Sequence, residues 1–337
     1  MSSPASFKLL KEVSNKEFFF AVARVPESTR LVVGAGNGSV YEVDPLAEKP
    51  EFREIKGHES YVTGVGLVGE TLLSVAYDGK LLWQKLDSGE IVRTVDAHSK
   101  WIRKLAISPS GTRVATVGDD MACRIWEIET GKLVFELKGH AERTPNHFPS
   151  MLYACGFSPD GRWLATADRV GRIVVWDADN GAKVHELDAP LCYTWDAKQR
   201  IHSIGGVRSV AFSTDSQLLA IGGMGQVGNI DHLEGPNRLE VFALADGKKV
   251  HEFSGDAKGL LETLAFHPQG EWLLACGGDN GGVIQFYDLA AKKIVRTEKF
   301  GTHLHACLLN ETADRLFAVG HGKIGVWEIG KAEAVKE

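Results

Sequence analysis

Seven copies of one short sequence pattern run through this chain, and this repetition limits its fold more than any other feature. Three copies near the middle are ISPSGTRVATVGDDMACRIWEIETGKLV, FSPDGRWLATADRVGRIVVWDADNGAKV and FHPQGEWLLACGGDNGGVIQFYDLAAKKIV. Each copy has two apolar runs separated by a turn, followed by a third run that ends in an aromatic residue. A unit of this length cannot bury its apolar side chains without its neighbours, so the copies must pack against one another.

The aromatic residues that end the third apolar run mark the period of the repeat. They are Tyr41, Trp83, Trp126, Trp176, Phe242, Tyr287 and Trp327. Most lie about 40 to 45 residues apart, and the spacing is wider on either side of Trp176. The turns between the runs carry proline, glycine and aspartate, as in SPDG at Ser158, and such residues interrupt strands. The runs therefore predict four short strands per copy, and no segment has a long helical period.

Dipeptides at fixed places in the copies resemble those of the WD-repeat (tryptophan–aspartate repeat) family. Gly57-His58 and Gly139-His140 match the leading dipeptide of the family, and Trp176-Asp177 matches its terminal one. The resemblance covers nearly the whole chain. It implies an all-β fold, a seven-bladed β-propeller of four-stranded antiparallel blades.

The last copy lacks a convincing fourth strand, whereas an unused strand-like run lies at the start of the chain. The resemblance implies that this N-terminal strand, residues 6–14, closes the last blade as its outer strand. We therefore expect a single propeller over residues 1–337. Blades 1 to 7 would occupy residues 15–330, and residues 331–337 would form a tail.

The resemblance also implies a buried hydrogen-bonded set within a blade: a His, a Ser or Thr, an Asp and a Trp. Copies two and three carry it as His58, Ser74, Asp78 and Trp83, and as His98, Thr116, Asp120 and Trp126. In an enzyme a Ser-His-Asp set would suggest a nucleophile. Its recurrence at matching offsets favours a structural role instead. Copy four places Val170 where the Asp is expected, and copies one, five, six and seven lack the set.

Composition narrows the classes of function. The net charge of −6 gives no basic surface for nucleic acid, and no apolar run is long enough to span a membrane. The start of the chain has no signal-peptide pattern, and five cysteines without a CxxC pair suit reduced thiols. We therefore expect a cytoplasmic protein that is monomeric on its own.

Motifs for catalysis, cofactors and metals give no convincing match. Residues 223–228 have the letters of a dinucleotide-binding loop, but no helical pattern follows them. His303 and His305 lie on one side of a strand, and a metal site would need more ligands than these. We expect no enzymatic activity, no cofactor and no bound metal.

Three insertions interrupt the repeat, all in copies four and five. They read AERTPNHFPSM, LCYTWDAKQRIHSIGG and GMGQVGNIDHLEGPN. In a propeller the connections that hold them open on one face, and loops on a rigid scaffold often carry the binding residues. We predict a protein- or peptide-binding patch there. Its candidate residues are Arg143, His147, Tyr193, Trp195, Arg200, His202, Met224, Asn229, Asp231, His232 and Arg238.

Three other interpretations stay open. The insertions can pack on each other and bind nothing. They can cover a small-molecule or enzymatic site, with His147, His202, Asp231 and His232 as its polar groups. The ring can also be a module of a larger assembly that is bound through its sides. The favoured function is a non-enzymatic scaffold for a protein or peptide partner.

Overall fold

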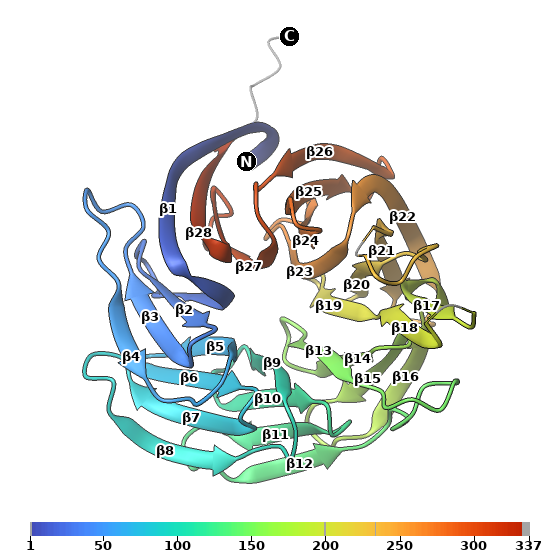
Figure 1. Ribbon diagram of the computed structural model, residues 1–337, viewed down its shortest axis with the longest axis horizontal. Helices are drawn as coiled ribbons and strands as arrows, with labels where there is room; N and C mark the ends of the chain where they lie inside the picture. The colour runs from blue at the N-terminus through green and yellow to red at the C-terminus, as the bar shows by residue number, and fades with distance from the viewer. Residues whose placement is uncertain (1, 199, 233, 332–337) are drawn as a thin grey trace.

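The computed structural model describes residues 2–198, 200–232 and 234–331, which form a ring of antiparallel β-sheets around a central axis (Figure 1). Besides its strands, this part of the chain contains a short 3-10 helix, η1 (Pro190–Cys192). Within the described ranges, no helix has the length and apolar character needed to cross a membrane. The predictions of an all-β propeller and of four-stranded antiparallel blades are confirmed.

Five of the sheets have four strands each, in which consecutive strands pair with one another. The second copy forms β5 (Val62–Val68), β6 (Thr71–Ala76), β7 (Lys80–Lys85) and β8 (Ile91–Asp96). The third forms β9 (Ile102–Ile107), β10 (Arg113–Gly118), β11 (Cys123–Glu127) and β12 (Leu133–Leu137). The fourth forms β13 (Leu152–Phe157), β14 (Trp163–Asp168), β15 (Arg172–Asp177) and β16 (Lys183–Asp188). The fifth forms β19 (Val207–Phe212), β20 (Leu218–Met224), β21 (Pro236–Ala243) and β22 (Lys249–Lys258). The sixth forms β23 (Leu260–Phe266), β24 (Leu273–Gly278), β25 (Val283–Asp288) and β26 (Lys293–Lys299).

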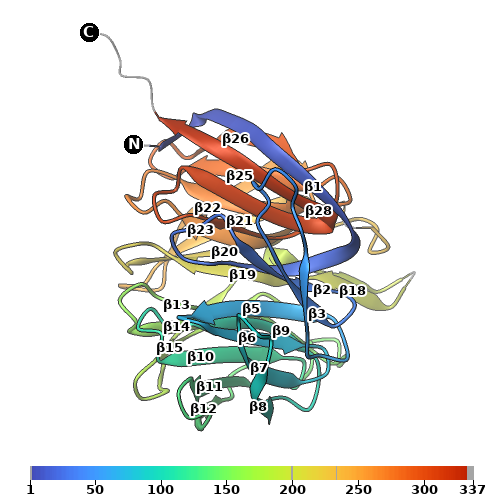
Figure 2. The same ribbon diagram turned by 90° about the vertical axis from the view of Figure 1, so that its left-hand side faces the viewer.

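The first and last copies share one six-stranded sheet. Its strands, in spatial order, are β27 (Leu304–Leu309), β28 (Arg315–Lys331), β1 (Ser2–Arg24), β2 (Leu31–Ala35), β3 (Ser39–Val43) and β4 (Arg53–Lys56). The prediction of seven separate four-stranded blades is therefore wrong in its count, since the ring has five four-stranded sheets and this six-stranded one. The reason is that β1 is continuous: its first part pairs with β28, from Phe7 opposite Ile329 to Phe18 opposite His321, and its last part pairs with β2. Figure 2 shows β1 running beside β28.

The sequence forms these strands because turn residues alternate with apolar runs. Ser158 begins one such turn, where Gly161 has a φ of 76° and the Ser158 hydroxyl accepts a hydrogen bond from the Trp163 amide. The second strand of the sheet, β14, is buried over nearly its whole length, whereas the outermost strand, β16, is mostly exposed. Both faces of each inner strand are thus covered by neighbouring sheets, which explains their continuous apolar runs.

The hydrophobic core is divided into clusters between neighbouring sheets rather than gathered at one centre. One cluster joins Ile125 of β11 to Leu152 of β13, and another joins Leu239 of β21 to Leu273 of β24. A further cluster joins the two halves of the six-stranded sheet, with Phe19 and Phe317 fully or almost fully buried. The five cysteines are buried and none forms a disulfide. Burial of apolar surface between sheets thus holds the ring together.

Candidate functional site

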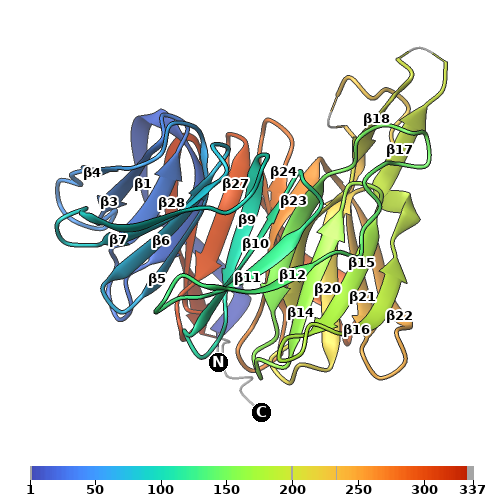
Figure 3. The same cartoon turned by 90° about the horizontal axis from the view of Figure 1, so that it is seen from below.

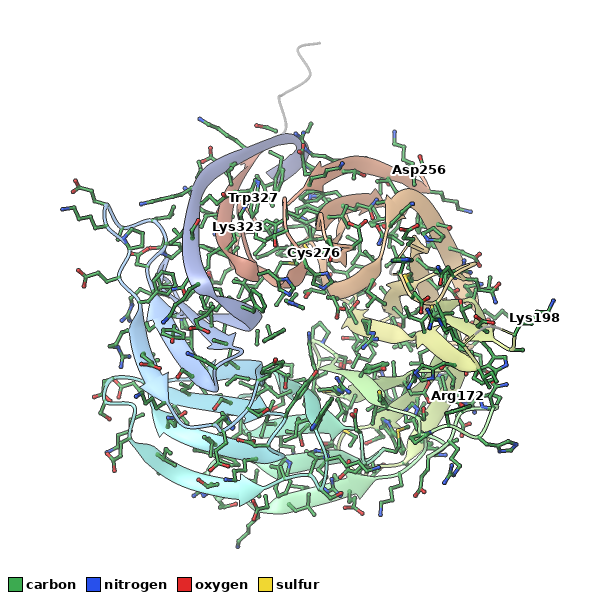
Figure 4. The ribbon with its side chains drawn as sticks, viewed as in Figure 1. Arg172, Lys198, Asp256, Cys276, Lys323 and Trp327 are labelled. Carbon is green, nitrogen blue, oxygen red and sulfur yellow. The ribbon has the colours of Figure 1, made fainter. Side chains whose placement is uncertain are left out.

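The three inserted segments lie on the same face of the ring (Figure 3). Residues 141–151 connect β12 to β13, residues 191–206 connect β16 to β19, and residues 225–235 connect β20 to β21. The second segment contains a separate hairpin of β17 (Tyr193–Asp196) and β18 (His202–Gly205). Figure 4 shows Lys198, near the hairpin tip, at the outer rim of the ring. We call this side of the molecule the insertion face.

Polar contacts connect the three segments to one another. The Tyr193 hydroxyl lies 3.2 Å from Asn146 Oδ1, and the Val227 amide donates to Thr194 Oγ1 at 3.0 Å. Between the hairpin and the third segment, Arg200 Nε and Nη2 lie 3.0 and 2.5 Å from Asp231 Oδ2. Both charged side chains are substantially exposed, so this ion pair adds little to stability. It does fix the position of the hairpin relative to the third segment.

Aromatic side chains pack at the centre of these segments. The Phe148 ring lies 5.4 Å from the Trp195 ring and 5.9 Å from the His202 ring. Phe148, Tyr193 and Trp195 are half-buried, whereas His202 is exposed. Tyr193 and Trp195, predicted as contacts for a partner, therefore also hold the inserted segments together.

Several predicted residues do present their side chains to solvent. Arg143 and His147 are exposed in a tight loop, where Arg143 donates to the His147 carbonyl oxygen at 2.7 Å and His147 has a φ of 66°. Asn229 and His232 are exposed in the third segment, and the Asn229 side chain accepts a hydrogen bond from the Asp231 amide. These residues outline an exposed polar rim on the insertion face.

Two predicted residues are not on the exposed surface, which corrects the sequence-based patch. Met224 is fully buried as the last residue of β20. Arg238 is buried in β21, where its guanidinium forms ion pairs with Glu240 at 2.6 Å and Glu252 at 2.7 Å. Both residues belong to strands that extend further into the insertion than the sequence pattern indicated. Ile201 at the hairpin tip was missed, although it is 60% exposed.

The predicted polar sets come together inside two sheets. His58 Nδ1 lies 2.9 Å from Asp78 Oδ2, and its Nε2 lies 2.9 Å from Ser74 Oγ. The set of His98, Thr116, Asp120 and Trp126 has the same geometry, and there the Trp126 indole donates to Thr116 Oγ1 at 3.1 Å. Trp83 departs from the expected arrangement, because its indole donates to the Ile128 carbonyl oxygen of the neighbouring sheet.

The fourth copy also has a complete polar set, contrary to the prediction from Val170. His140 Nδ1 lies 2.9 Å from Asp168 Oδ2, and its Nε2 lies 2.8 Å from Thr166 Oγ1. Thr166 Oγ1 accepts from the Trp176 indole at 2.9 Å. The carboxylate is supplied by the last residue of β14 rather than by the following turn. The signal for it, an acidic residue two positions before Val170, was present in the sequence.

The Asp120 set predicts a dependence of stability on pH. Burial alone raises the pKa of the Asp120 carboxyl, but the hydrogen bond and charge of His98, together with Arg124, lower it well below its usual value. Because this pKa is lower in the folded state, the stabilisation is present at neutral pH and is lost as pH falls below the unfolded-state value. When the pH is lowered from about 5 to about 3, we expect the free energy of unfolding to fall less in Asp120→Asn than in wild type. Chemical denaturation at both pH values measures this, and an unchanged pH dependence would contradict it.

A row of aromatic residues at the end of the central channel was not predicted from the sequence. Tyr61 and Trp101 are each about half exposed, and the Tyr77 ring stacks on Trp101 at 4.5 Å and lies 5.7 Å from Tyr61. Arg103 lies over both the Tyr77 and the Trp101 rings. Tyr61 and Trp101 occupy the same position relative to the histidines of their copies, and this spacing could have revealed them.

The three histidines of the last copy lie close together without forming a metal site. The rings of His303, His305 and His321 are separated by 4.4 to 5.3 Å. Among the residues that the structure describes, no group of three or more His, Cys, Asp or Glu side chains could hold a metal ion. His305 lies on the innermost strand β27, His303 directly before it and His321 on the neighbouring strand β28.

Comparison with known proteins identifies the repeat. The model of the WD40 family (WD domain, G-beta repeat) matches residues 89–127, 131–177 and 247–288. All three matches begin just before the outermost strand of one sheet, as the first does before β8 (Ile91–Asp96). Each match ends with the third strand of the next sheet.

Relatives with curated descriptions match over longer stretches. The chain is 26% identical over 290 residues to the U3 small nucleolar RNA-associated protein 4 homolog of Homo sapiens, covering 84% of this chain and 39% of that protein. It is 22% identical over 295 residues to human pre-mRNA-processing factor 17, covering 83% of this chain and 45% of that protein. It is 29% identical over 175 residues to apoptotic protease-activating factor 1 of Rattus norvegicus, covering 51% of this chain and 13% of that protein. The chain thus spans less than half the length of these relatives. Three of the repeats in this chain thus match the WD40 family model, and together with the arrangement of the sheets these matches support a WD-repeat β-propeller.

Proposed function

We propose that this chain is a non-enzymatic scaffold that binds a protein or peptide partner through the insertion face. The exposed residues of the insertion face include the predicted Arg143, His147, Arg200, His202, Asn229, Asp231 and His232, together with Ile201. The names of its relatives support a role in larger assemblies, since they denote an RNA-associated protein, a pre-mRNA-processing factor and a protease-activating factor. The net charge of −6 favours a protein partner over nucleic acid.

One observation carries this proposal: the segments that distinguish copies four and five from the other copies converge on one face. They hold each other through Tyr193–Asn146, Thr194–Val227 and Arg200–Asp231 contacts, so the loops form one surface. Loops that a rigid scaffold holds in place are well suited to recognition, because little conformational entropy is lost on binding.

The alternative of a small-molecule or enzymatic site receives no such support. His202 packs against Phe148, and Asp231 forms an ion pair with Arg200. His147 and His232 are exposed on different segments. These four side chains therefore either hold the inserted segments together or face solvent. Their positions favour a binding surface over an enzymatic site.

We further propose that residues 1–337 form a single domain with seven blade equivalents, residues 15–330. The six-stranded sheet would supply two of them, because a hydrophobic cluster packs its two halves together. Residues 6–14 would be the closing strand, as the pairing of Phe7 with Ile329 and of Ser14 with Lys323 supports. Within the proposed tail, 331–337, residues 332–337 lie outside the described residues.

A double substitution tests the binding surface. We expect Arg143→Ala with Ile201→Ala to reduce capture of partners from a native lysate at least about tenfold, because exposed arginine and large apolar side chains dominate such contacts. Thermal unfolding should be unchanged, since both side chains are exposed. Quantitative mass spectrometry of captured proteins measures the loss.

The matched control is Arg162→Ala with Leu133→Ala, which removes an exposed arginine and an exposed aliphatic side chain elsewhere on the ring. The control should capture partners as wild type does. Equal capture by both double variants would contradict the proposed surface. Loss of capture after ribonuclease treatment would instead assign the association to RNA.

A further inference from the structure

The innermost strands of the ring all carry a β-bulge at the same place. In the strand register one residue is skipped in each of β1, β5, β9 and β13, and these residues are Phe20, Thr63, Arg103 and Tyr153. The corresponding residues of β19, β23 and β27 are Arg208, Glu262 and His305. A bulge redirects a side chain relative to the regular strand. The repeated bulge therefore sets a ring of unlike side chains around the channel.

This ring lies at the insertion-face end of the channel. Tyr153 and Arg208 are the second residues of β13 and β19, and the inserted segments 141–151 and 191–206 lie directly before these two strands. Six of the seven bulge residues line one cavity of about 180 Å³, together with Tyr77 and Lys104. We call this cavity the channel mouth. Figure 1 shows β5, β9, β13, β19, β23 and β27 arranged around the central opening.

Cations outnumber carboxylates among the groups of the channel mouth that have no ion partner. Arg103 is neutralised, because its Nε and Nη2 each lie 2.7 Å from the Asp119 carboxylate. Lys104 and Arg208 form no ion pair with any residue that the structure describes, and the same holds for Glu262. Two unpaired cations thus face one unpaired carboxylate.

The channel mouth also contains polar atoms without partners. Arg208 Nε and His305 Nε2 are buried and have no hydrogen-bond partner among the described residues. The Arg208 guanidinium lies only 3.6 Å from the centre of the Tyr153 ring, which fixes its position. Burial, aided by the charges of His303, His321 and Lys104, lowers the pKa of His305 to about 2, so this imidazole is neutral. Leaving such buried atoms without partners is unfavourable, and a bound acceptor would remove that cost.

We propose that the channel mouth binds an oxyanion, a carboxylate or a phosphate group, between the Lys104 ammonium and the Arg208 guanidinium. Lysine and arginine donate only, and they form their strongest hydrogen bonds to charged oxygens. His305 supplies a third donor when its proton is on Nε2. The cavity of about 180 Å³ is large enough for such a group. This site is independent of the exposed patch on the insertion loops.

Titration calorimetry of the full chain with inorganic phosphate, and separately with acetate, tests the site at matched ionic strength. Each charge-assisted hydrogen bond contributes enough that Arg208→Gln and Lys104→Gln should each weaken phosphate binding at least about tenfold. Glu262→Gln should tighten it, because a repelling carboxylate is removed. Arg208→Lys keeps the charge but loses Nε, so its affinity should fall between those of wild type and Arg208→Gln.

The matched controls are Lys132→Gln and Glu59→Gln, which change exposed charges away from the channel mouth and should bind as wild type. Phosphate binding without acetate binding would assign the site to phosphate groups, and binding of both would include carboxylates. Thermal unfolding curves confirm that each variant is folded. The proposal is overturned if neither anion binds wild type, or if Arg208→Gln and Lys104→Gln bind phosphate as tightly as the controls do.

Discussion

Asp168→Ala is expected to lower the free energy of unfolding by about 3 to 5 kcal/mol, one of the largest effects of a single substitution in this chain. The Asp168 carboxylate lies against His140 Nδ1 and also accepts hydrogen bonds from the amides of Val170 and Arg172. Both the Asp168 and the His140 side chains are almost completely buried. Removing the carboxylate leaves these donors without partners in a site that water does not reach. Chemical denaturation of wild type and variant measures the difference.

Val170→Ala is the control for this prediction, because Val170 occupies the place where the repeat pattern expects the acidic residue. Val170 is only half-buried and its side chain takes no part in the polar set. We expect this substitution to cost about 1 kcal/mol or less. If Asp168→Ala were no more destabilising than Val170→Ala, the polar set of the fourth copy would contribute nothing to stability.

The position of Asp168 shows why the sequence predicted the fold better than its details. Strands and turns follow from local chemistry, such as the Pro and Gly residues after Ser158 and the apolar run before Trp176. The carboxylate of the polar set can come from any position within hydrogen-bond distance of the histidine. Asp168, the last residue of β14, meets this condition. Comparison of the repeats at strictly aligned positions misses such a replacement, although the acidic residue stands only two positions away.

The candidate patch was predicted in part for a related reason. The inserted segments are longer than the repeat requires, and that excess length is visible in the sequence. Where a strand ends inside an insertion depends on pairing with other strands, so Met224 and Arg238 were assigned to loops although they pair in β20 and β21. The predicted number of sheets was wrong for a similar reason. Nothing in the sequence shows that β1 continues from its pairing with β28 to its pairing with β2.

The ring of bulges left no signal that sequence comparison could use. The bulge residues differ in size, charge and polarity, as Phe20, Arg103 and Glu262 illustrate. What they share is a backbone irregularity at the same point of the innermost strand. Side chains at such positions are free to differ, because they point into the channel rather than into the packed sheets. The ring of bulge residues was therefore accessible only from the structure.

Phe7→Ala is expected to destabilise the fold by about 3 kcal/mol, because it weakens the contact between the two ends of the chain. The Phe7 ring stacks on Trp327 at 5.8 Å and meets Phe286 edge-on at 5.2 Å, and the Arg296 guanidinium lies over its face. Phe7 therefore connects β1 both to β28 and to the neighbouring β23–β26 sheet. Thermal and chemical unfolding measure the loss.

Leu9→Ala provides the matched comparison on the same strand. Leu9 pairs with Trp327 in the strand register, but its side chain is 47% exposed, so its removal should cost about 1 kcal/mol or less. A weakened β1 also leaves the edge of β28 open, and open edges pair with other chains. Phe7→Ala should therefore aggregate on heating more readily than Leu9→Ala, and light scattering would measure this difference. Equal stability of the two variants would mean that backbone pairing alone closes the ring, without the aromatic contacts of Phe7.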